Sequence, residues 1–362
     1  MRKINIGITA RLSLSEWNSS TKQGSVFLYD CLKSCGFNVF YLSDQVNICP
    51  INKDHKAYDI RQAHLKDFPD IDLIILHGFT INKEHYDLIK LRNPKIKTCV
   101  YHHGNRIAID QQSLIAGGNF LDKLDFVDEI WIPPHHSNSA TYLKVFHGGE
   151  ARVRTVPYIW NSFFIDENCR KNGEIKYNPK QGPKVVVLEP NRNFSKNCLI
   201  PMVTCENFNN RFPNVVKSFN IFNTQIIKEH ANLFDVVSDL NISIENKLYL
   251  NKKWKTPDVF RKIGQYVLSH QITNELNFLY FEALYLGLPL IHNSSMLKGY
   301  GYYYSDNDIL TAAAQLYNSI INHEENFEDY QDQNSILINK FSPLHETNKN
   351  FFKKIISQIV KK

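Results

Sequence analysis

The segment that most constrains the fold is residues 266–293, which reads YVLSHQITNELNFLYFEALYLGLPLIHN. It opens with a short apolar run, continues through a polar stretch, and then repeats apolar residues at helical spacing until Gly287 and Pro289. A second apolar run, 288–291, follows. The pattern predicts a strand, a loop, a helix and a second strand. Strands joined in this way within one sheet are parallel, with a right-handed crossover.

The polar loop of this segment is expected at the carboxyl edge of the sheet, where open parallel sheets bind ligands. The helix after it would offer unpaired N–H groups and a partial positive charge that suit a phosphate. Glu282 lies seven positions beyond Glu275, so on a helix both carboxylates would project along one face. Glu282 is placed to accept the hydroxyls of a ribose, although an exposed glutamate on an amphipathic helix explains the spacing equally well.

Several motifs make the chain resemble the GT-B glycosyltransferases, and more closely a bacterial and phage family of unknown function related to those enzymes. The likeness spans about residues 4–305. The motifs are IPPHH at 132–136, EPNRNFSK at 189–196, SHQITNELNFLY at 269–280, HNS at 292–294 and the run NFLYFEALYLGLPLIHN at 277–293. The resemblance implies an α/β protein of GT-B architecture, with two Rossmann-like doubly wound domains facing a central cleft. The second domain would bind a nucleotide-sugar donor and the first an acceptor.

The resemblance also implies roles for individual residues. In such enzymes a lysine or arginine after the first strand of the second domain neutralises the leaving diphosphate, and Lys196 matches that position with Arg192 as its companion. Retaining members often separate two glutamates by seven residues, whereas six separate Glu275 from Glu282. Either Asn274 takes the first position or the motif has drifted. The predicted site residues are His103 and Glu275 for catalysis; Arg192, Lys196, His270, Asn274, Asn277 and Glu282 for the donor; and Trp17, Asn18, His102 and His135 for the acceptor.

The candidate residues of the first half follow from their position after predicted strands. The strand at 97–101 ends in HHGNR, and polar side chains just past the carboxyl end of a parallel strand lie over the binding crevice. Adjacent histidines point to opposite sides of an extended chain, so we favour His103 as the one that orients a sugar or acts as a base. A structural histidine is the alternative. The loop 11–24, which carries Trp17 and Asn18, would face the cleft or form an ordinary surface loop.

The length of 362 residues fits two α/β domains. We expect an acceptor domain at 1–160, a linker rich in Asn, Lys, Gly and Pro at 161–183, and a donor domain at 184–342. By the resemblance, a terminal helix at 343–362 crosses back to the first domain. No apolar run is long enough for a signal peptide or a membrane span, which favours a cytoplasmic protein.

Charge and metal-binding patterns narrow the chemistry further. The net charge of +6 favours polyanionic ligands, and lysines cluster at 251–255 and 351–362, where a solvated loop and an amphipathic helix are the simpler interpretation. Seven scattered cysteines lack zinc spacing and indicate reduced thiols. The Asp-x-Asp patterns at 70–72 and 306–308 are explained by a strand entry and a helix cap. The sequence therefore predicts no metal and no cofactor beyond the nucleotide-sugar.

Three functions compete at this stage. The leading hypothesis is a metal-independent glycosyltransferase, a hexosyl- or pentosyltransferase that moves a sugar from a UDP-sugar to an acceptor hydroxyl on a glycan or other molecule. The first alternative is a phage-type enzyme that attaches a sugar to a hydroxylated cytosine in DNA, which salt-sensitive binding to duplex DNA would favour. The second is a nucleotide- or sugar-binding module without turnover. Binding of the donor without hydrolysis or transfer would favour it.

Overall fold

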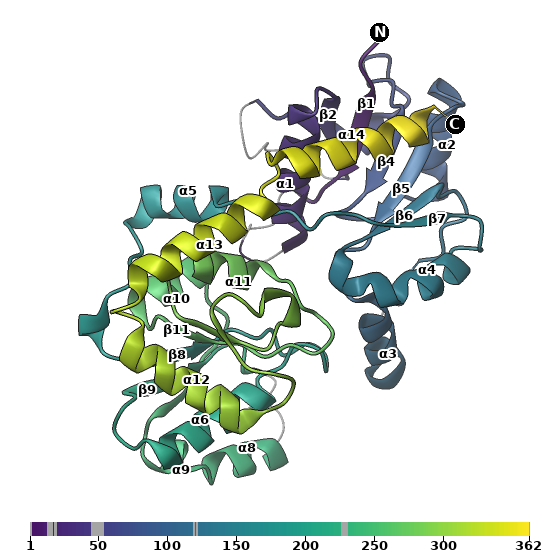
Figure 1. Ribbon diagram of the computed structural model, residues 1–362. Helices are drawn as coiled ribbons and strands as arrows, with labels where there is room; N and C mark the ends of the chain where they lie inside the picture. Colours follow the sequence, from purple (N-terminus) through teal and green to yellow (C-terminus); the bar gives the residue numbers. More distant parts are fainter. Residues whose placement is uncertain are drawn as a thin grey trace. The chain divides into compact units, whose positions relative to one another are not determined.

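The computed structural model describes residues 2–12, 17, 20–44, 54–118, 120, 122–225 and 231–361. The chain divides into two compact units (Figure 1). Unit 1 comprises Met1–Asn161 and Asn339–Lys362, and unit 2 comprises Ser162–Ile338. Each unit holds one parallel β-sheet with helices packed on it. The protein is therefore of the mixed α/β class, with two parallel sheets.

Unit 1 contains a seven-stranded sheet of order β3-β2-β1-β4-β5-β6-β7. Its strands are β1 Asn5–Thr9, β2 Asn38–Ser43, β3 Ala57–Asp59, β4 Leu73–Leu76, β5 Lys97–Tyr101, β6 Glu129–Ile132 and β7 Arg152–Thr155. Its helices are α1 Ser20–Ser34, α2 Lys83–Arg92, α3 Arg106–Ala116, α4 Ala140–Phe146 and α14 Glu346–Val360, with short 3-10 turns η1 Ile60–Gln62 and η2 Pro134–Ser139. The strand order changes direction between β1 and β4, which sets the switch point of this sheet.

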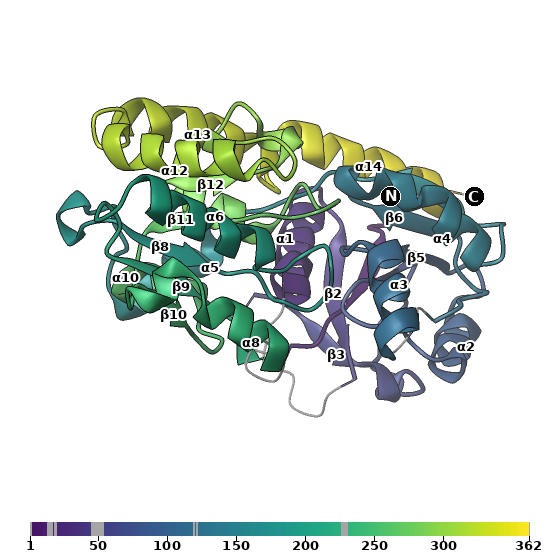
Figure 2. The same cartoon turned by 90° about the horizontal axis from the view of Figure 1, so that it is seen from below.

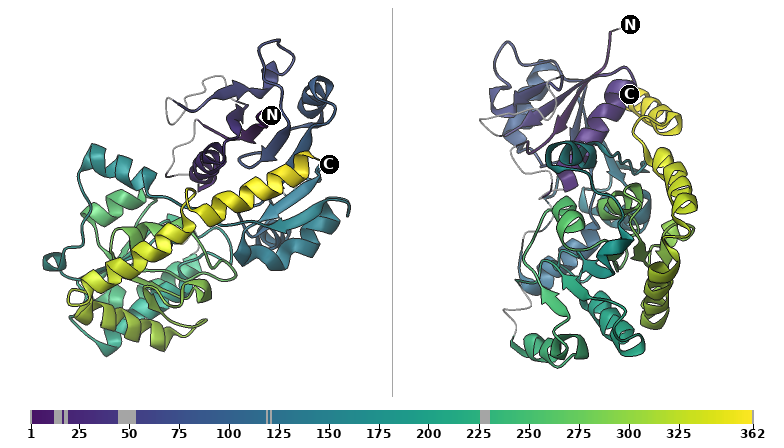
Figure 3. Two further views of the ribbon diagram at one scale, coloured as in Figure 1. Left: turned by 45° about the horizontal axis from the view of Figure 1, so that its top comes forward. Right: turned by 90° about the vertical axis from the view of Figure 1, so that its left-hand side faces the viewer.

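The core of unit 1 follows from strands that are apolar on both faces. β4 reads LIIL and is buried throughout, as expected for a central parallel strand. One face of the sheet packs against Ile89 of α2 and Leu143 of α4. Phe352 of α14 is buried, and its ring centroid lies 5.8 Å from that of Trp131. The terminal helix α14 also lies along α1 (Figure 3). There Cys35 Sγ, just after α1, donates to Lys349 O at 3.4 Å.

Unit 2 contains a six-stranded sheet of order β10-β9-β8-β11-β12-β13. Its strands are β8 Lys184–Val187, β9 Ser218–Ile221, β10 Leu248–Leu250, β11 Tyr266–Leu268, β12 Leu290–His292 and β13 Tyr302–Tyr303. Its helices are α5 Phe163–Asn172, α6 Leu199–Arg211, α8 Ala231–Ser238, α9 Asn241–Ile244, α10 Thr256–Lys262, α11 Phe278–Tyr285, α12 Ile309–Asn322 and α13 Phe327–Phe341, with η3 Pro179–Gln181 and η4 Ser295–Leu297. The order repeats the pattern of unit 1, with the switch point now between β8 and β11.

The layers of unit 2 follow from right-handed crossovers in opposite directions. The chain moves from β8 to β9 through α6 and from β11 to β12 through α11, so the two helices lie on opposite faces of the sheet. α12 packs beside α6 (Figure 2), and Phe208 and Leu316 are fully buried in the core between these helices and the sheet. The carboxyl ends of β8 and β11 are thereby held at a rigid edge.

The segment 161–183, predicted from its composition to be a linker, contains α5 and η3. After β6, residues Pro134–Ser139 form the 3-10 turn η2, and α4 begins at Ala140. Within the described part of the chain, no helix combines the length and the apolar character needed to cross a bilayer.

Candidate functional site

Two loops meet at the switch point of the second sheet. Residues 188–198 leave the carboxyl end of β8, and residues 269–277 leave that of β11. The N–H of Ile272 donates to the carbonyl of Ser195 at 2.9 Å, so the loops are joined through their backbones. Because ligands of open parallel sheets bind at this edge, the joined loops are the first candidate site.

Glu189 ties the same loops together through its side chain. It is fully buried, and it accepts hydrogen bonds from Ser269 Oγ and from Gln271 Nε2, the latter at 3.2 Å. Burial raises the pKa of Glu189 to about 7, although the bond from Ser269 and the charge of Lys196 act in the opposite direction. The carboxyl group therefore changes charge close to neutral pH.

Lys196 supplies a positive charge next to this carboxyl group. Burial lowers the pKa of Lys196, and Glu189 partly offsets that effect. Its ammonium forms no hydrogen bond or ion pair with any residue that the structure describes. Asn191, at φ 51°, shapes the loop by accepting from the N–H of Cys198 at 2.7 Å. Arg192 is exposed on the same loop.

Three buried polar atoms in these loops also lack partners among the described residues. They are Ser195 Oγ, His270 Nε2 and Asn277 Nδ2. Unsatisfied buried polar atoms are rare and costly in folded proteins, so their grouping in two joined loops points to a ligand.

The hydrogen bonds of His270 define its tautomer. Tyr304 donates its single hydroxyl hydrogen to Ser269 O at 3.1 Å, and the same hydroxyl lies 3.0 Å from His270 Nδ1. Nδ1 must therefore carry the proton and donate it to Tyr304. Burial lowers the pKa of His270, opposed by the side chain of Asn307, so the ring is neutral at pH 7. His270 Nε2 then presents a lone pair that can accept a hydrogen bond.

Glu282 lies within α11, the helix that follows the loop after β11. Glu282 is only 5% exposed. Its carboxyl group forms no hydrogen bond with the residues that the structure describes. Burial raises the pKa of Glu282 to about 8. Burying a carboxyl group without a partner is costly, so its position favours a role in binding over one in stability.

Glu275 and Asn274 do not form the predicted helical pair with Glu282. α11 begins at Phe278, because Asn277 caps it by accepting from the N–H of Tyr280 at 3.1 Å. Glu275 therefore precedes the helix, and its Oε2 accepts from the N–H of Ser295 at 2.7 Å. The prediction of a shared helix face is wrong, and the Glu275 carboxylate serves a structural contact. The side chain of Asn274 is buried and donates to Gln271 Oε1.

A second group of side chains lies at the carboxyl edge of the sheet in unit 1. We call it the ring cluster: His77, Tyr101, His103, His135 and Tyr158, which follow or end β4, β5, β6 and β7. Ring centroids lie 4.5 Å apart for His77 and His103, 4.4 Å for Tyr101 and His103, and 5.3 Å for His135 and Tyr158. Sequence reasoning missed His77, although it directly follows a predicted strand, as His102 and His103 do.

The remaining acceptor candidates have different environments. His102 is buried, its Nε2 lies 3.4 Å from that of His147, and burial lowers its pKa to about 3. This packing accounts for His102 without a ligand. Trp17 is partly buried, whereas Asn18 lies outside the described residues.

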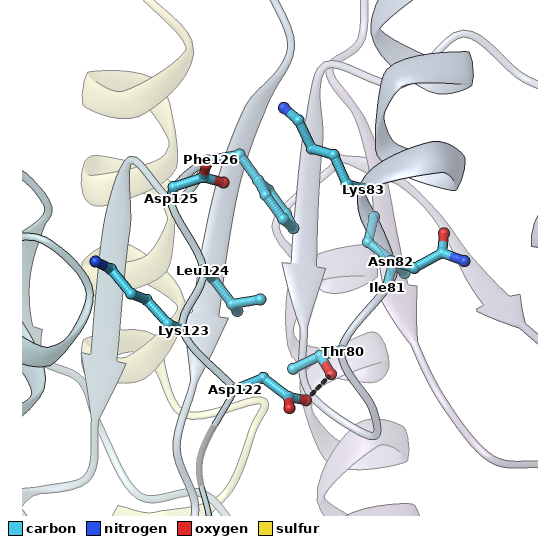
Figure 4. Close-up of a pocket in the computed structure, with 9 residues that line it drawn as sticks. All are labelled: Thr80, Ile81, Asn82, Lys83, Asp122, Lys123, Leu124, Asp125 and Phe126. Atoms are coloured by element: carbon cyan, nitrogen blue, oxygen red, sulfur yellow. Dashed lines mark hydrogen bonds between the residues drawn. The ribbon is translucent and has the colours of Figure 1, made fainter.

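A pocket of 620 Å³ lies elsewhere in unit 1 (Figure 4). Its walls are residues 80–83, which follow β4, and residues 122–126, which precede β6. Thr80 Oγ1 donates to Asp122 Oδ2 at 2.9 Å across it. It contains none of the predicted site residues.

The two Asp-x-Asp patterns have structural partners. Asp72 pairs with Arg2 at 3.2 Å, and Asp308 caps α12 by accepting from the N–H of Thr311 at 3.0 Å. In the described part of the chain, no group of three His, Cys, Asp or Glu side chains is placed to hold a metal ion.

We expect Asp308→Ala to lower the unfolding temperature and to leave ligand binding unchanged, because the substitution removes a helix cap. Asp308→Asn should restore most of the stability, since asparagine caps equally well. Thermal unfolding followed by circular dichroism measures both variants. A loss of metal-dependent activity without loss of stability would contradict the capping role.

The fold is of the GT-B type, with two Rossmann-like units that each hold one parallel sheet. The chain belongs to the DUF2827 family, described as a protein of unknown function, whose model matches residues 4–356. No curated protein sequence matches the chain.

Solved structures share the fold at low sequence identity. An α-glucosyltransferase in complex with UDP and a 13-mer DNA containing a HMU base has a TM-score of 0.60 and 11% identity, covering 100% of both chains. The N-terminal domain of Candida albicans trehalose-6-phosphate phosphatase has a TM-score of 0.61 and 10% identity, covering 100% of this chain and 97% of that one. Anabaena Alr3699/HepE in complex with UDP-glucose has a TM-score of 0.55 and 10% identity, covering 98% of this chain and 100% of that one.

Proposed function

We propose that this protein is a glycosyltransferase that moves a sugar from a nucleotide-sugar, expected to be a UDP-sugar, to an acceptor hydroxyl without a metal ion or a further cofactor. The observation that most supports this proposal is the pair of joined loops at the switch point of the sheet in unit 2. They hold the Lys196 ammonium next to Glu189, and three of their buried polar atoms have no hydrogen-bond partner among the described residues. The UDP and UDP-glucose complexes of structural neighbours support the same choice of donor.

The donor would lie along the loops and α11. Its diphosphate would accept from the Lys196 ammonium, Asn277 Nδ2 and the first N–H groups of α11, with Arg192 adding positive charge. A donor hydroxyl would donate to His270 Nε2. Glu282 would accept the ribose hydroxyls. When the bond between the anomeric carbon and the phosphate oxygen breaks, negative charge grows on the diphosphate, and Lys196 stabilises it where a metal would otherwise be needed.

The acceptor would bind unit 1 at the ring cluster. His103 is the candidate that orients or deprotonates the attacking hydroxyl, and His135 is a further contact. Trp17 and Asn18 remain proposed acceptor residues on the loop before α1.

Gly24→Ala should reduce transfer by up to about 100-fold while leaving donor affinity unchanged, because catalysis is sensitive to small displacements of an acting group. A Cβ at Gly24 would lie 2.9 Å from His103 Nε2 and 3.1 Å from His77 Cε1, so the ring of His103 must move. Gly299→Ala is the control, since a Cβ there has no neighbour within 4 Å among the atoms considered. Steady-state transfer and donor titration separate the two effects, and unchanged transfer by a folded Gly24→Ala variant would remove His103 from the reaction.

A thermal-shift screen of nucleoside diphosphates and their sugars tests the proposed donor site. A ligand at 100 times its dissociation constant adds about 2.7 kcal/mol to the free energy of unfolding. We expect UDP and a UDP-sugar to stabilise the protein, and Glu282→Gln to reduce the shift. Stabilisation by none of the nucleotides would contradict the proposal. Stabilisation by a nucleotide-sugar without hydrolysis or transfer would instead support a binding module.

One observation favours DNA as an alternative acceptor. Burial and the charge of Arg192 lower the pKa of Lys253, so two cations from separate loops of unit 2 lie close to each other. The neighbouring Trp254 is 37% exposed. Clustered cations beside an exposed aromatic ring suit a nucleic acid. Binding of duplex DNA that weakens steeply with salt, and is reduced in Lys253→Ala, would select this acceptor.

A further inference from the structure

We propose that Glu189 is a positioning residue that takes up a proton when a nucleotide-sugar binds, and thereby makes donor affinity depend on pH. The inference rests on the donor site proposed above and deepens it. Glu189 would not touch the reacting atoms. It would act through the two loops that it joins and through Lys196.

Glu189 connects the loop after β8 to the loop after β11 through hydrogen bonds of its side chain. It follows β8, yet its hydrogen-bond donors Ser269 and Gln271 follow β11, 80 and 82 residues further along the chain. Gln271 in turn accepts from Asn274 Nδ2, and its backbone N–H donates to Asn293 Oδ1 at 3.0 Å. The network thus extends from Glu189 to the segment just before α11 and to the end of β12. Glu189 is thus connected by hydrogen bonds to the backbone that would hold the diphosphate.

The surroundings of Glu189 satisfy both of its charge states. As a carboxylate it accepts from Ser269 Oγ and Gln271 Nε2. When Oε1 takes a proton from solvent, it can donate to Ser269 Oγ instead. The hydroxyl hydrogen of Ser269 then has a second acceptor, Tyr280 OH at 3.3 Å. Protonation therefore needs the rotation of one hydroxyl and no rearrangement of the loops.

Among the titratable groups that face Glu189, Lys196 favours its charged form, as the hydrogen bonds from Ser269 and Gln271 also do. The titratable groups that face it are Lys196 from its own loop, Cys198 at the start of α6, Tyr280 of α11 and Tyr304 after β13. Burial raises the pKa of Cys198 to about 11 and raises those of both tyrosines, so these three groups stay neutral at pH 7. Lys196 is then the charged group among them that stabilises the carboxylate.

Binding of a diphosphate near Lys196 favours the protonated form of Glu189. The phosphates bring negative charge to Lys196, which offsets the stabilisation of the Glu189 carboxylate and adds repulsion. Binding therefore raises the pKa of Glu189 above its free-state value of about 7. Affinity is then highest below that value and falls by up to about tenfold per pH unit above it, until the pH reaches the pKa of the bound state.

Titration calorimetry with UDP-glucose, in buffers of different ionisation enthalpy, measures the proton directly. Both phosphates of UDP-glucose are esterified, so the ligand does not titrate near pH 7 as a terminal phosphate does. We expect an uptake of about half a proton at pH 7, rising toward one at pH 8. Tight binding by the wild-type protein without proton uptake at either pH would overturn the inference and leave the donor site standing.

Glu189→Gln is the matched variant, because glutamine keeps the size of the side chain and cannot change charge. It should abolish proton uptake and flatten the dependence of affinity on pH between 7 and 8.5, with folding checked by thermal unfolding. Uptake that persists in a folded Glu189→Gln variant would assign the proton to another group, such as Lys196, and overturn the inference. If the variant does not fold, the absence of proton uptake by the wild-type protein still overturns the inference. Absence of binding by any nucleotide-sugar would remove the basis of both proposals.

Discussion

Replacing Glu282 by glutamine is expected to make the protein more stable at pH 8 and, at the same time, to weaken its binding of a nucleotide-sugar. The gain in stability follows from burial, which raises the pKa of Glu282 to about 8 in the folded protein. The ordinary value for glutamate is about 4.3 in an unfolded chain. Between these two values the folded state holds more protons than the unfolded state, so stability falls as pH rises.

The size of this effect depends on pH. At pH 4 the wild-type protein and Glu282→Gln should differ little, because the carboxyl group is then mostly protonated in the folded and in the unfolded state. At pH 8 the variant should be more stable by on the order of 2–4 kcal/mol, since it removes the penalty of ionising a buried carboxyl group. Urea unfolding at the two pH values measures the difference. Equal stabilities at pH 8 would show that Glu282 has a partner when charged.

The loss of binding has a separate cause. If Glu282 accepts both ribose hydroxyls, the amide can accept only through its oxygen, and we expect nucleotide affinity to fall by about 1–3 kcal/mol. Titration calorimetry with UDP-glucose measures it. Glu275→Gln is the control, because that carboxylate bonds the backbone of Ser295. Unchanged affinity in a folded Glu282→Gln variant would refute the ribose assignment.

Lys196→Ala is expected to reduce turnover by about 100- to 1000-fold, with a smaller loss of donor affinity. The two quantities separate because the charge on the diphosphate grows as the sugar leaves, so the ammonium stabilises the transition state more than the bound donor. Release of UDP in single-turnover experiments measures the chemical step.

Two variants serve as comparisons for this effect. Lys196→Arg keeps the charge and should retain part of the rate, whereas Arg192→Ala removes an exposed charge from the same loop and should cost less. If Lys196→Ala changes affinity and turnover by the same factor, Lys196 is a binding residue only.

The sequence predicted those features that depend on local pattern. The apolar run that opens the segment 266–293 becomes β11, and the run 288–291 leads into β12, since a parallel strand covered on both faces favours apolar residues. Right-handed crossovers then bring the loops after β8 and β11 to one edge, which is where the structure joins them. Arg192, Lys196, His270, Asn274, Asn277 and Glu282 all lie on these loops or on α11.

The missed features depend on contacts between distant segments. Glu189 stood in a recognised motif, yet its role comes from donors that follow a different strand. Glu275 was expected to share a helix face with Glu282, but the side chain of Asn277 caps α11, so the helix begins after Glu275. His77 was passed over because a single histidine after a strand carries no signal until the neighbouring strands bring other rings beside it.

The path of the chain through the two units has a consequence for how the protein is made. Unit 2 is continuous in sequence, whereas unit 1 also needs residues 339–362, which follow unit 2 in the chain. A nascent chain that ends before α14 leaves Trp131 without its contact to Phe352 and α1 without its neighbouring helix. Domains usually fold in order from the N-terminus during synthesis. Here unit 2 can fold first, and unit 1 is complete only after residues 339–362 have been synthesised.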